Sequence, residues 1–409
     1  MLPVEEAVHR IIQSVKTKGT ENVALVDGLN RILADDVVAP MDLPRFTHAT
    51  VDGFAIGRQG AKGASIPKGS RFRVIENVRA GSVARSLVKP GLAIRVMTGA
   101  PLPPGADAVI KEEDTTLRGS RTLIQIERSI APYENLASAG ESVHRGELIL
   151  QRGTKLRPRN IGILASFGIH EVEVFQQPAV AVFSTGNELV GLEDRLESGK
   201  IFASSLYVLL AKLKASGCVP VSLGVIRDDA AHIRKQIRSG LVADAIITVG
   251  GTQRGDSDWV RDVFRQMKIH TKIDGVAMSP GKSFTFGLLE EKPIFSLPGS
   301  PTACIVVFEE LVRPALMKMK GEIGYQNPAG STIKMILDGK VRGKPKLRKY
   351  VLAMVVLRDG RLTAIPINRG HRGSLMPIAK ANGAIILPED SLEMRSGNEV
   401  NVRFFDGGP

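Results

Sequence analysis

A regular alternation of apolar runs and amphipathic stretches, beginning after Pro178, most constrains the fold. Strands that alternate with helices form a mainly parallel sheet, because each crossover lays its helix against one face of the sheet. The alternation therefore predicts a doubly wound α/β domain. Its predicted strands and helices are residues 180–183, 204–216, 219–225, 230–239, 245–249 and 259–267.

Polar, glycine-rich turns follow the predicted strands. In doubly wound sheets, ligands bind beyond the carboxyl ends of the strands. We therefore predict a ligand site at this edge, to which the segment Ser279–Lys282 adds a cation. A long helix predicted from Thr302 to about Met319 would also point its N-terminus at the site. The turns are residues 183–189, 226–229, 250–258 and 297–301.

The turn at 250–258 contains both glycines and carboxylates. Gly250, Gly251 and Gly255 supply backbone freedom, and the following helix would offer free N–H groups to an anion. Two aspartates, Asp256 and Asp258, would repel a phosphate unless a divalent cation lay between them. The turn indicates either a metal-bridged phosphate site or a plain loop in which Asp caps the helix.

Outside the α/β domain, the patterns change. Residues 3–16 have the spacing of an amphipathic helix, and a helical turn is expected at 31–34. Short alternating strands between residues 66 and 130 predict a small β domain, and residues 327–409 predict a second one. The expected fold class is α/β multidomain: the doubly wound domain, two small β domains and an elongated N-terminal α+β domain. The predicted domains are 1–45 with 140–176, then 46–139, 177–325 and 326–409.

Composition limits the classes of partner. The 409 residues carry a net charge of +13, from 55 Lys and Arg against 42 Asp and Glu. The densest basic run, 340–349, has no interleaved aromatic residues, so nucleic-acid binding is not favoured. Two isolated cysteines, Cys218 and Cys304, lie in apolar settings typical of buried thiols. The chain shows neither an apolar span nor a signal-peptide pattern, so we expect a cytoplasmic protein with no membrane partner.

Several motifs in the same order resemble those of the molybdopterin molybdenumtransferase family, which comprises MoeA in bacteria and the E domain of gephyrin in animals. The family pattern Met-Asp-Gly-Tyr/Phe-Ala corresponds to Val51–Ala55, and Met-Thr-Gly-Ala-Pro corresponds to Met97–Pro101. The other matching segments are Phe183–Leu189, Arg227–Asp229, Gly250–Asp258 and Pro298–Pro301.

This resemblance implies an elongated four-domain homodimer that converts adenylylated molybdopterin and molybdate, or tungstate, into molybdenum cofactor and AMP. A divalent cation such as Mg²⁺ would assist, held by Glu188 and Asp258, and the molybdopterin adenylyltransferase is an expected partner. The residues implied at the reaction centre are Asp52, Thr98, Glu188, Asp228 and Asp258. The implied substrate-binding residues are Ser184, Thr185, Gly186, Gly250, Gly251, Gly255, Asp256, Pro280, Gly281, Lys282, Pro298, Gly299, Ser300 and Pro301.

The chain also departs from the family pattern. Two family lysines are replaced by Gly275 and Ser279, which leaves Lys282, with Arg254 as a candidate to compensate. Other departures are Ala139–Ser142, Ala203–Ser205 and Gln253. Two functions follow as hypotheses: an insertase with a variant anion pocket, or a non-catalytic paralogue that binds molybdopterin as a carrier or scaffold. The retained carboxylates favour the enzyme. Because the site motifs are spread over two domains, we expect the active site at a dimer interface.

Overall fold

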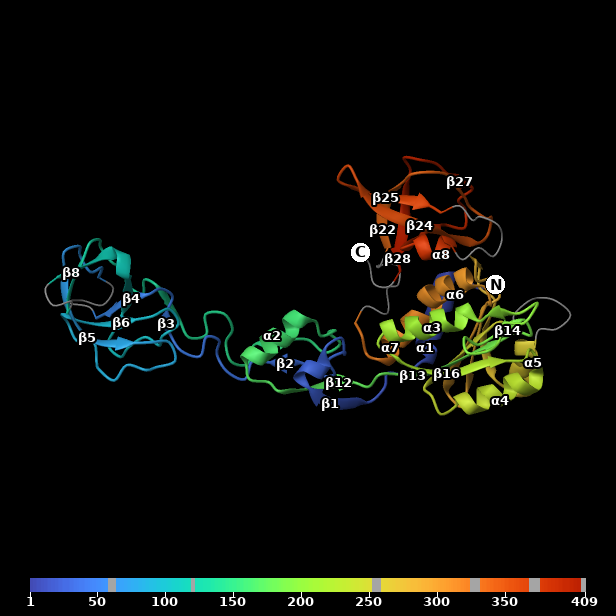
Figure 1. Cartoon of the computed structure of the whole chain (residues 1–409), viewed down its shortest axis with the longest axis horizontal. Coiled ribbons are helices and arrows are strands. Elements are labelled where there is room, and N and C mark those ends of the chain that lie inside the picture. Colours follow the sequence, from blue (N-terminus) through green and yellow to red (C-terminus); the bar gives the residue numbers. More distant parts are fainter. Residues whose placement is uncertain (58–63, 119–121, 252–258, 324–331, 368–375, 406–409) are drawn as a thin grey trace. The chain divides into compact units, whose positions relative to one another are not determined.

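A computed structural model describes residues 1–57, 64–118, 122–251, 259–323, 332–367 and 376–405. The chain forms two compact units, each of which is described by itself (Figure 1). The first unit comprises Met1–Asp35, Arg152–Ile161 and Glu171–Pro409, and the second comprises Asp36–Gln151 and Gly162–His170. Each unit is therefore assembled from segments that are separated in the sequence.

A six-stranded sheet is the centre of the first unit. Its strands lie in the order β16 (Val219–Ile226), β13 (Ala179–Thr185), β17 (Ala245–Val249), β21 (Lys292–Leu297), β20 (Thr285–Leu289) and β18 (His270–Asp274). The pairings among the first four strands are parallel, as the sequence predicted. The last two strands are antiparallel to their neighbours, so the sheet is mixed.

A tight hairpin explains this difference from the predicted parallel sheet. Glu290 and Glu291 connect β20 to β21 with φ values of 51° and 64°. Positive φ at both central residues matches the turn type whose twist suits a two-residue hairpin. Two glutamates are not a usual sequence signal for such a turn, which is why the antiparallel strand was not anticipated.

Helices cover both faces of this sheet (Figure 1). Successive residues of a strand point to opposite faces. Accordingly, Val180 and Val182 of β13 join one core with the helices α1 and α3, while Ala181 and Phe183 join the other core with α4 and α5. The helices are α1 (Val4–Ser14), α3 (Ser204–Ala215), α4 (Ala230–Gly240), α5 (Trp259–Gln266), α6 (Pro301–Val307), the π-helical η3 (Phe308–Val312) and α7 (Arg313–Met319).

Two predicted helices take more specific forms in the structure. The helix expected from Thr302 to Met319 consists of α6, a π-helical segment η3 and α7 in continuous succession. The amphipathic N-terminal helix is confirmed as α1, which buries Val4, Ala7, Val8 and Ile11 and lies against α7 and η3. Helix α1 thus belongs to the core of the α/β sheet, whereas the sequence analysis grouped residues 1–45 with 140–176.

Beside the sheet, β1 (Thr20–Ala24) pairs with β12 (Glu171–Phe175), and the 3₁₀-helix η1 (Leu25–Gly28) follows β1. The helical turn expected at residues 31–34 is wrong. Ile32 and Leu33 instead form bridges to Lys155 and Val174, and both side chains are buried. Pairing with distant segments therefore overrides the local helical preference at this point.

The C-terminal part of the first unit is a closed β barrel. Its strands pair in the order β24 (Arg348–Arg358), β25 (Arg361–Pro366), β22 (Thr332–Leu337), β28 (Glu399–Phe404) and β26 (Gly383–Leu387), and β26 pairs back with β24. The short β19 (Met278–Ser279) adds to β24 at one side. The predicted C-terminal β domain is thus present, with the short helix α8 (Met376–Lys380).

Smaller elements complete the first unit. Glu310 of η3, which is buried, accepts a hydrogen bond from Tyr350 of β24 and pairs with Arg403 of β28, so the barrel is joined to the helical layer by buried polar contacts. The remaining strand pairs are β14 (Leu189–Val190) with β15 (Ile201–Phe202), and β23 (Val341–Arg342) with β27 (Glu393–Met394).

The second unit is built around another six-stranded sheet. Its order is β7 (Ala108–Lys111), β4 (Gly53–Ile56), β6 (Leu92–Val96), β5 (Arg71–Val78), β9 (Leu123–Ile126) and β8 (Thr115–Arg118). These strands include all four that the sequence pattern indicated. Further elements are β2 (Val37–Val38), β3 (His48–Ala49), η2 (Glu112–Asp114), β10 (Leu136–Ala137), β11 (Leu148–Leu150) and α2 (Pro158–Ser166), which begins in the first unit.

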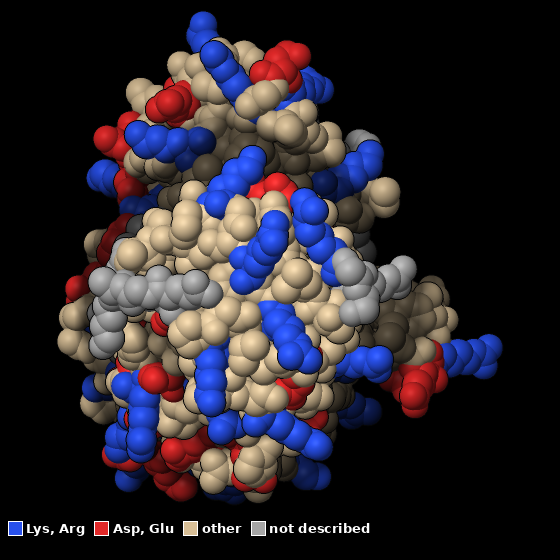
Figure 2. All heavy atoms as spheres, turned by 90° about the vertical axis from the view of Figure 1, so that its left-hand side faces the viewer, with Lys and Arg blue, Asp and Glu red and all other residues tan. Residues whose placement is uncertain are grey.

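Surface charge and buried thiols agree with the sequence analysis. Lys and Arg side chains are distributed over the whole of the face in Figure 2, with Asp and Glu among them. Cys218 and Cys304 are both buried and free. Burial raises the pKa of the Cys218 thiol to about 12, so it stays protonated. No helix in the described ranges has the length and apolar character needed to span a bilayer.

Candidate active site

The strands of the α/β sheet end at one common edge. Thr185 pairs with Ile226, and both Ser184 and Leu297 pair with Val249, so four strands finish level with one another. The antiparallel β20 begins at this same edge, because its first residue pairs with the end of β21. The predicted segment Pro280–Lys282, which precedes β20, therefore joins the other turns there. The register supports the predicted location of a ligand site.

Thr185 and Asp228 form what we call the sheet-edge pair. The Thr185 hydroxyl donates to Asp228 Oδ1 at 2.9 Å and lies 3.3 Å from the carbonyl oxygen of Arg227. Thr185 is the last residue of β13 and is only 2% exposed. A buried hydroxyl donor thus fixes one carboxylate oxygen of Asp228.

Two glycine turns pack directly against this pair. A Cβ atom at Gly250, where φ is +96°, would collide with the carbonyl oxygen of Thr185. A Cβ at Gly251, where φ is +64°, would lie 3.2 Å from Asp228 Oδ1. A Cβ atom at Gly299 would lie 3.5 Å from the Cα of Gly250, which is an ordinary contact distance. The absence of side chains therefore lets the turn at Gly250 and Gly251 approach the sheet-edge pair closely, and lets the turn at Gly299 pack against it.

The turn after β13 brings a second carboxylate to the edge. A Cβ at Gly186 would lie 2.9 Å from Glu188 Oε1, so the Glu188 side chain folds back over that glycine. Asn187 accepts a hydrogen bond from the Asp228 backbone N–H at 3.2 Å. The predicted residues Gly186, Glu188 and Asp228 are thus held in one small region, which is rich in oxygen ligands.

One polar group at this edge lacks a partner. The Ser184 hydroxyl is fully buried and has no hydrogen-bond partner among the described atoms. Ser184 lies two residues after Val182 and so faces the side covered by α3 and α6. A buried polar group without a partner costs free energy, and a ligand oxygen beside Ser184 would supply the missing bond.

The start of α6 also reaches the edge. Ser300 caps this helix by accepting from the Ala303 N–H, and Pro301 occupies its first turn after Pro298 and Gly299. The Ser205 hydroxyl of α3 donates to the Gly299 carbonyl at 2.8 Å, which ties two helix starts together. Ser205 belongs to a segment that departs from the family pattern, and its hydroxyl here has a structural role.

The segment with Lys282 is shaped by close packing. A Cβ at Gly281 would lie 2.6 Å from Val307 of α6, and φ there is +114°. Pro280 precedes this glycine, and Lys282 itself is exposed. Gly275, one of the two positions where a family lysine is missing, has φ of +88° and lies close to the Lys282 carbonyl. A lysine at 275 would be strained in this conformation.

Asp52 and Thr98 form what we call the β-domain pair, in the second unit. Asp52 Oδ1 accepts from the Thr98 N–H at 2.7 Å and from the Thr98 hydroxyl at 2.8 Å. These hydrogen bonds, the backbone one above all, hold the pKa of Asp52 below its ordinary value of 3.8. Both residues are exposed. The sequence analysis therefore named two residues, 46 apart, that the fold brings into direct contact.

Three predicted residues, Gly255, Asp256 and Asp258, lie outside the described residues, as do Gln253 and Arg254. Within the described ranges, no group of three or more Asp, Glu, His or Cys side chains is placed to hold a metal ion. The predicted metal pair Glu188 and Asp258 thus stays a prediction. Oxygen ligands of the kind that Mg²⁺ prefers are present at the edge in Glu188 and Asp228.

The sequence analysis missed one cation at this edge. Lys200 Nζ donates to the carbonyl oxygen of Asn187 at 2.6 Å, which places an ammonium group beside the turn that carries Glu188. Lys200 lies in a loop before the short strand β15, so no periodic pattern could single it out. The only sequence signal was its position, 13 residues after the asparagine of a glycine-rich turn.

Comparison with known proteins decides the family. The chain matches three family profiles: the MoeA N-terminal region (domain I and II) over residues 2–168, a probable molybdopterin binding domain over 181–318, and the MoeA C-terminal region (domain IV) over 334–405. It is 34% identical over 403 residues to the molybdopterin molybdenumtransferase of Staphylococcus aureus strain COL, covering 98% of this chain and 95% of that protein. The chain belongs to the MoeA family.

Other MoeA-family proteins give the same result. The molybdopterin molybdenumtransferase of Staphylococcus epidermidis strain ATCC 12228 is 34% identical over 406 residues, covering 98% and 95% of the two chains. The crystal structure of a molybdopterin biosynthesis MoeA protein from Pyrococcus horikoshii superposes with a TM-score of 0.83 at 30% identity, covering 99% of each chain. The predicted multidomain α/β architecture is therefore confirmed as that of the MoeA family.

Proposed function

We propose that this chain is a molybdopterin molybdenumtransferase. It inserts molybdate, or tungstate, into adenylylated molybdopterin and releases AMP, giving molybdenum cofactor. The single observation that carries the proposal is the sheet-edge pair, because Thr185 and Asp228 meet the glycine turns where the strands end. Membership of the MoeA family supplies the reaction class.

The chemistry of the edge suits a phosphate-bearing substrate. Glycines at 250, 251 and 299 let the main chain approach a ligand closely, and backbone N–H groups are good donors to phosphate oxygens. We assign Ser184 the role of a further donor, because its buried hydroxyl has no partner among the residues that the structure describes. Thr185 then orients Asp228 for the reaction, rather than contacting the substrate itself.

A divalent cation is part of the proposal. Carboxylates and phosphates repel one another unless a cation joins them, and Glu188 and Asp228 place carboxylates beside the glycine turns. We propose that Glu188 and Asp258 hold Mg²⁺ or a similar ion. When bound, this ion would neutralise charge on the phosphate and polarise its bond to the leaving group.

Asp52 and Thr98 complete the proposed set. The two hydrogen bonds from Thr98 favour the ionised form of Asp52, so the carboxylate is available as a charged ligand or base at neutral pH. Asp256 and Gly255, together with Pro280, Gly281, Lys282 and the segment Pro298–Pro301, stay proposed substrate contacts.

The assembly is also proposed. We infer a homodimer and an interaction with the molybdopterin adenylyltransferase that produces the adenylylated substrate; both rest on the family resemblance. Sedimentation at micromolar protein tests the dimer, and an active monomer would contradict it. The cytoplasmic location expected from the sequence stays a prediction.

The test of function separates the enzyme from a non-catalytic scaffold. Purified protein is mixed with adenylylated molybdopterin, Mg²⁺ and molybdate, and released AMP is followed by chromatography. We expect several AMP molecules per active site. Binding of molybdopterin without AMP release at any molybdate or tungstate concentration would instead identify a carrier or scaffold.

A further inference from the structure

A basic cavity of about 550 Å³ lies in the first unit, away from the sheet-edge site. Gln177 and Gly217, which line it, come just before β13 and β16, and Gln177 donates to the Gly217 carbonyl at 3.0 Å. The cavity therefore adjoins the amino ends of these strands, whereas the proposed active site adjoins their carboxyl ends. The seven residues of β13 separate the two sites by roughly 20 Å.

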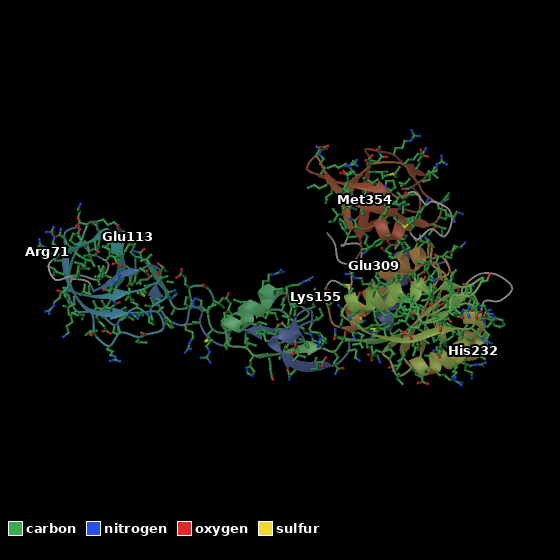
Figure 3. All side chains as sticks on the ribbon, in the orientation of Figure 1. Arg71, Glu113, Lys155, His232, Glu309 and Met354 are labelled. Atoms are coloured by element: carbon green, nitrogen blue, oxygen red, sulfur yellow. The ribbon has the colours of Figure 1, made fainter. Side chains whose placement is uncertain are left out.

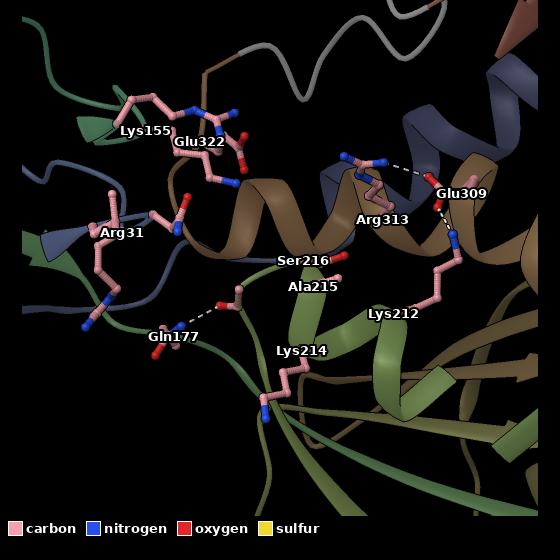
Figure 4. A pocket seen from close by; sticks show the side chains of 14 residues that line it. Arg31, Lys155, Gln177, Lys212, Lys214, Ala215, Ser216, Glu309, Arg313 and Glu322 are labelled. Atoms are coloured by element: carbon pink, nitrogen blue, oxygen red, sulfur yellow. Dashed lines mark hydrogen bonds and ion pairs between the residues drawn. The ribbon is translucent and has the colours of Figure 1, made fainter. Parts of the chain in front are cut away.

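Side chains from segments far apart in the sequence face this cavity (Figure 4). Figure 3 marks Lys155 and Glu309 on two of its walls. Six basic residues against two carboxylates line the cavity, which makes its charge strongly positive. The basic residues are Arg31, Lys155, Arg157, Lys212, Lys214 and Arg313.

Both carboxylates are already neutralised. Glu309 has a side chain only 3% exposed and pairs with Lys212 at 2.7 Å and with Arg313 at 2.8 Å. Glu322 pairs with Lys320 at 2.7 Å. Glu309 is therefore fully engaged, while Glu322 also interacts with Lys155 and offsets part of the positive charge there.

Three of the remaining cations have no salt-bridge partner in the described part of the chain. These are Lys155, which is half-buried, and the exposed Arg157 and Lys214. Burial and the nearby Lys320 lower the pKa of Lys155, so its charged form is disfavoured. An anion beside Lys155 would favour the charged form again, and Arg157 and Lys214 would attract the same anion.

Arg31 is another basic residue of the cavity lining, and its guanidinium is held in place. Its Nη2 donates to the Phe175 carbonyl at 2.9 Å and pairs with Glu21, which fixes the guanidinium. Its Nε is nonetheless buried with no hydrogen-bond partner among the described atoms. Arg31 therefore contributes a fixed positive charge to the wall of the cavity, whereas its buried Nε is not accessible to a ligand there.

We propose that this cavity binds a small ligand carrying two or more phosphate groups. Its volume is in the range of small-molecule sites. Phosphates carry more charge per group than carboxylates, and a polyphosphate chain can reach Lys155, Arg157 and Lys214 together. We propose binding and not a reaction, because the lining offers cations for an anion and both of its carboxylates are already in salt bridges.

Tripolyphosphate is the probe. The full-length protein is titrated with it by calorimetry at low ionic strength and without divalent ions. We expect Lys155→Gln and Lys214→Gln each to weaken binding about tenfold, as the loss of one charge-assisted contact requires. Lys214 is exposed, so its substitution leaves the fold intact and keeps the test valid even where the Lys155 variant is unstable.

Two controls locate the binding. Lys334→Gln, at an exposed position of the barrel strand β22, should leave the affinity unchanged. Lys282→Gln tests whether tripolyphosphate binds at the proposed active site instead of in the cavity. Equal affinities in Lys155→Gln, Lys214→Gln and Lys334→Gln proteins would overturn the proposal, as would a loss confined to Lys282→Gln. Tighter binding of citrate or of an oligoglutamate peptide would overturn the choice of ligand. AMP release by Lys214→Gln should equal that of the wild type.

Discussion

The sheet-edge pair and the β-domain pair have the same chemistry in different surroundings. In each, a threonine hydroxyl donates to one aspartate oxygen, at 2.9 Å in Thr185–Asp228 and at 2.8 Å in Asp52–Thr98. Thr185 is buried under glycine turns, whereas Thr98 and Asp52 are exposed and use a backbone N–H as well. One carboxylate is thus oriented in a tightly packed site, and the other by two donors of a single exposed residue, Thr98.

The difference has a physical consequence. The buried Thr185 hydroxyl cannot exchange a lost bond for one to water, so removing the Asp228 acceptor leaves it with the longer contact to the Arg227 carbonyl oxygen. An exposed pair can exchange the lost bond for one to water. Changes to the sheet-edge pair should therefore have larger effects than the matching changes to the β-domain pair.

The largest effect is expected at Asp228. Asp228→Asn removes the charge that the proposed site needs while keeping the side-chain shape, and we expect AMP release to slow by about 100-fold. Asp229→Asn makes the same change one residue away, where the side chain caps α4 and contacts His232 Nδ1. It should retain near wild-type turnover. Equal rates of AMP release in the two variants would show that Asp228 is not part of the active site.

Packing against the sheet-edge pair is tested at Gly250. Gly250→Ala places a methyl group against the Thr185 carbonyl in a left-handed backbone conformation, and should lower the free energy of unfolding by about 2 kcal/mol. Gly199→Ala, at φ of +80° in open space, carries only the conformational cost of about 1 kcal/mol. Urea denaturation measures both. A smaller loss at Gly250 than at Gly199 would show that the turn adapts freely.

The β-domain pair is tested through its pKa. Thr98→Val removes the hydroxyl but keeps the backbone N–H, which is the larger cause of the shift, so the pKa of Asp52 should rise only part of the way to 3.8. Folding lowers the pKa of Asp52, so its ionised carboxylate stabilises the folded protein at pH values above the pKa of the unfolded chain. This stabilisation is lost as the pH falls through the pKa of the folded state. NMR titration of the carboxyl carbon measures this. Thr116→Val is the control, and an identical shift there would disprove the local cause.

The smallest expected effect concerns the missing lysines. Since Gly275 has a conformation that lysine does not tolerate well, Ser279→Lys is the cleaner variant. We expect it to lower the half-saturating molybdate concentration roughly fivefold, as one partly exposed charged contact allows. Ser239→Lys adds the same charge to the exposed surface of α4 and should change nothing. A higher half-saturating concentration in Ser279→Lys would indicate a pocket shaped for a different anion.

The sequence predicted those parts of the fold and site that have local signals. Strand ends followed by glycine and aspartate located the turns around Thr185, Asp228 and Gly250, and alternation located the strands of the second unit. The hairpin at Glu290–Glu291 was missed because its turn residues are unusual for their conformation. The bridges of Ile32 and Leu33 were missed because they depend on partners more than 100 residues away.

The basic cavity also could not be predicted from the sequence, because it depends on residues that are distant along the chain. Its cations come from the segments around residues 31, 155, 214 and 313, and none of these segments has a motif. Only the tertiary structure brings them together. Likewise, Lys200 reaches the sheet edge by a single contact with the Asn187 carbonyl, which no spacing rule anticipates.

The most direct test of the account is the rate of molybdate-dependent AMP release by Asp52→Asn protein. The account holds that the β-domain pair serves the same reaction as the sheet-edge pair. It therefore predicts a rate at least about tenfold below that of the wild type, with only a small loss of stability, because Asp52 is exposed. A rate equal to that of the wild type would contradict the account, since the reaction would then need only the sheet edge.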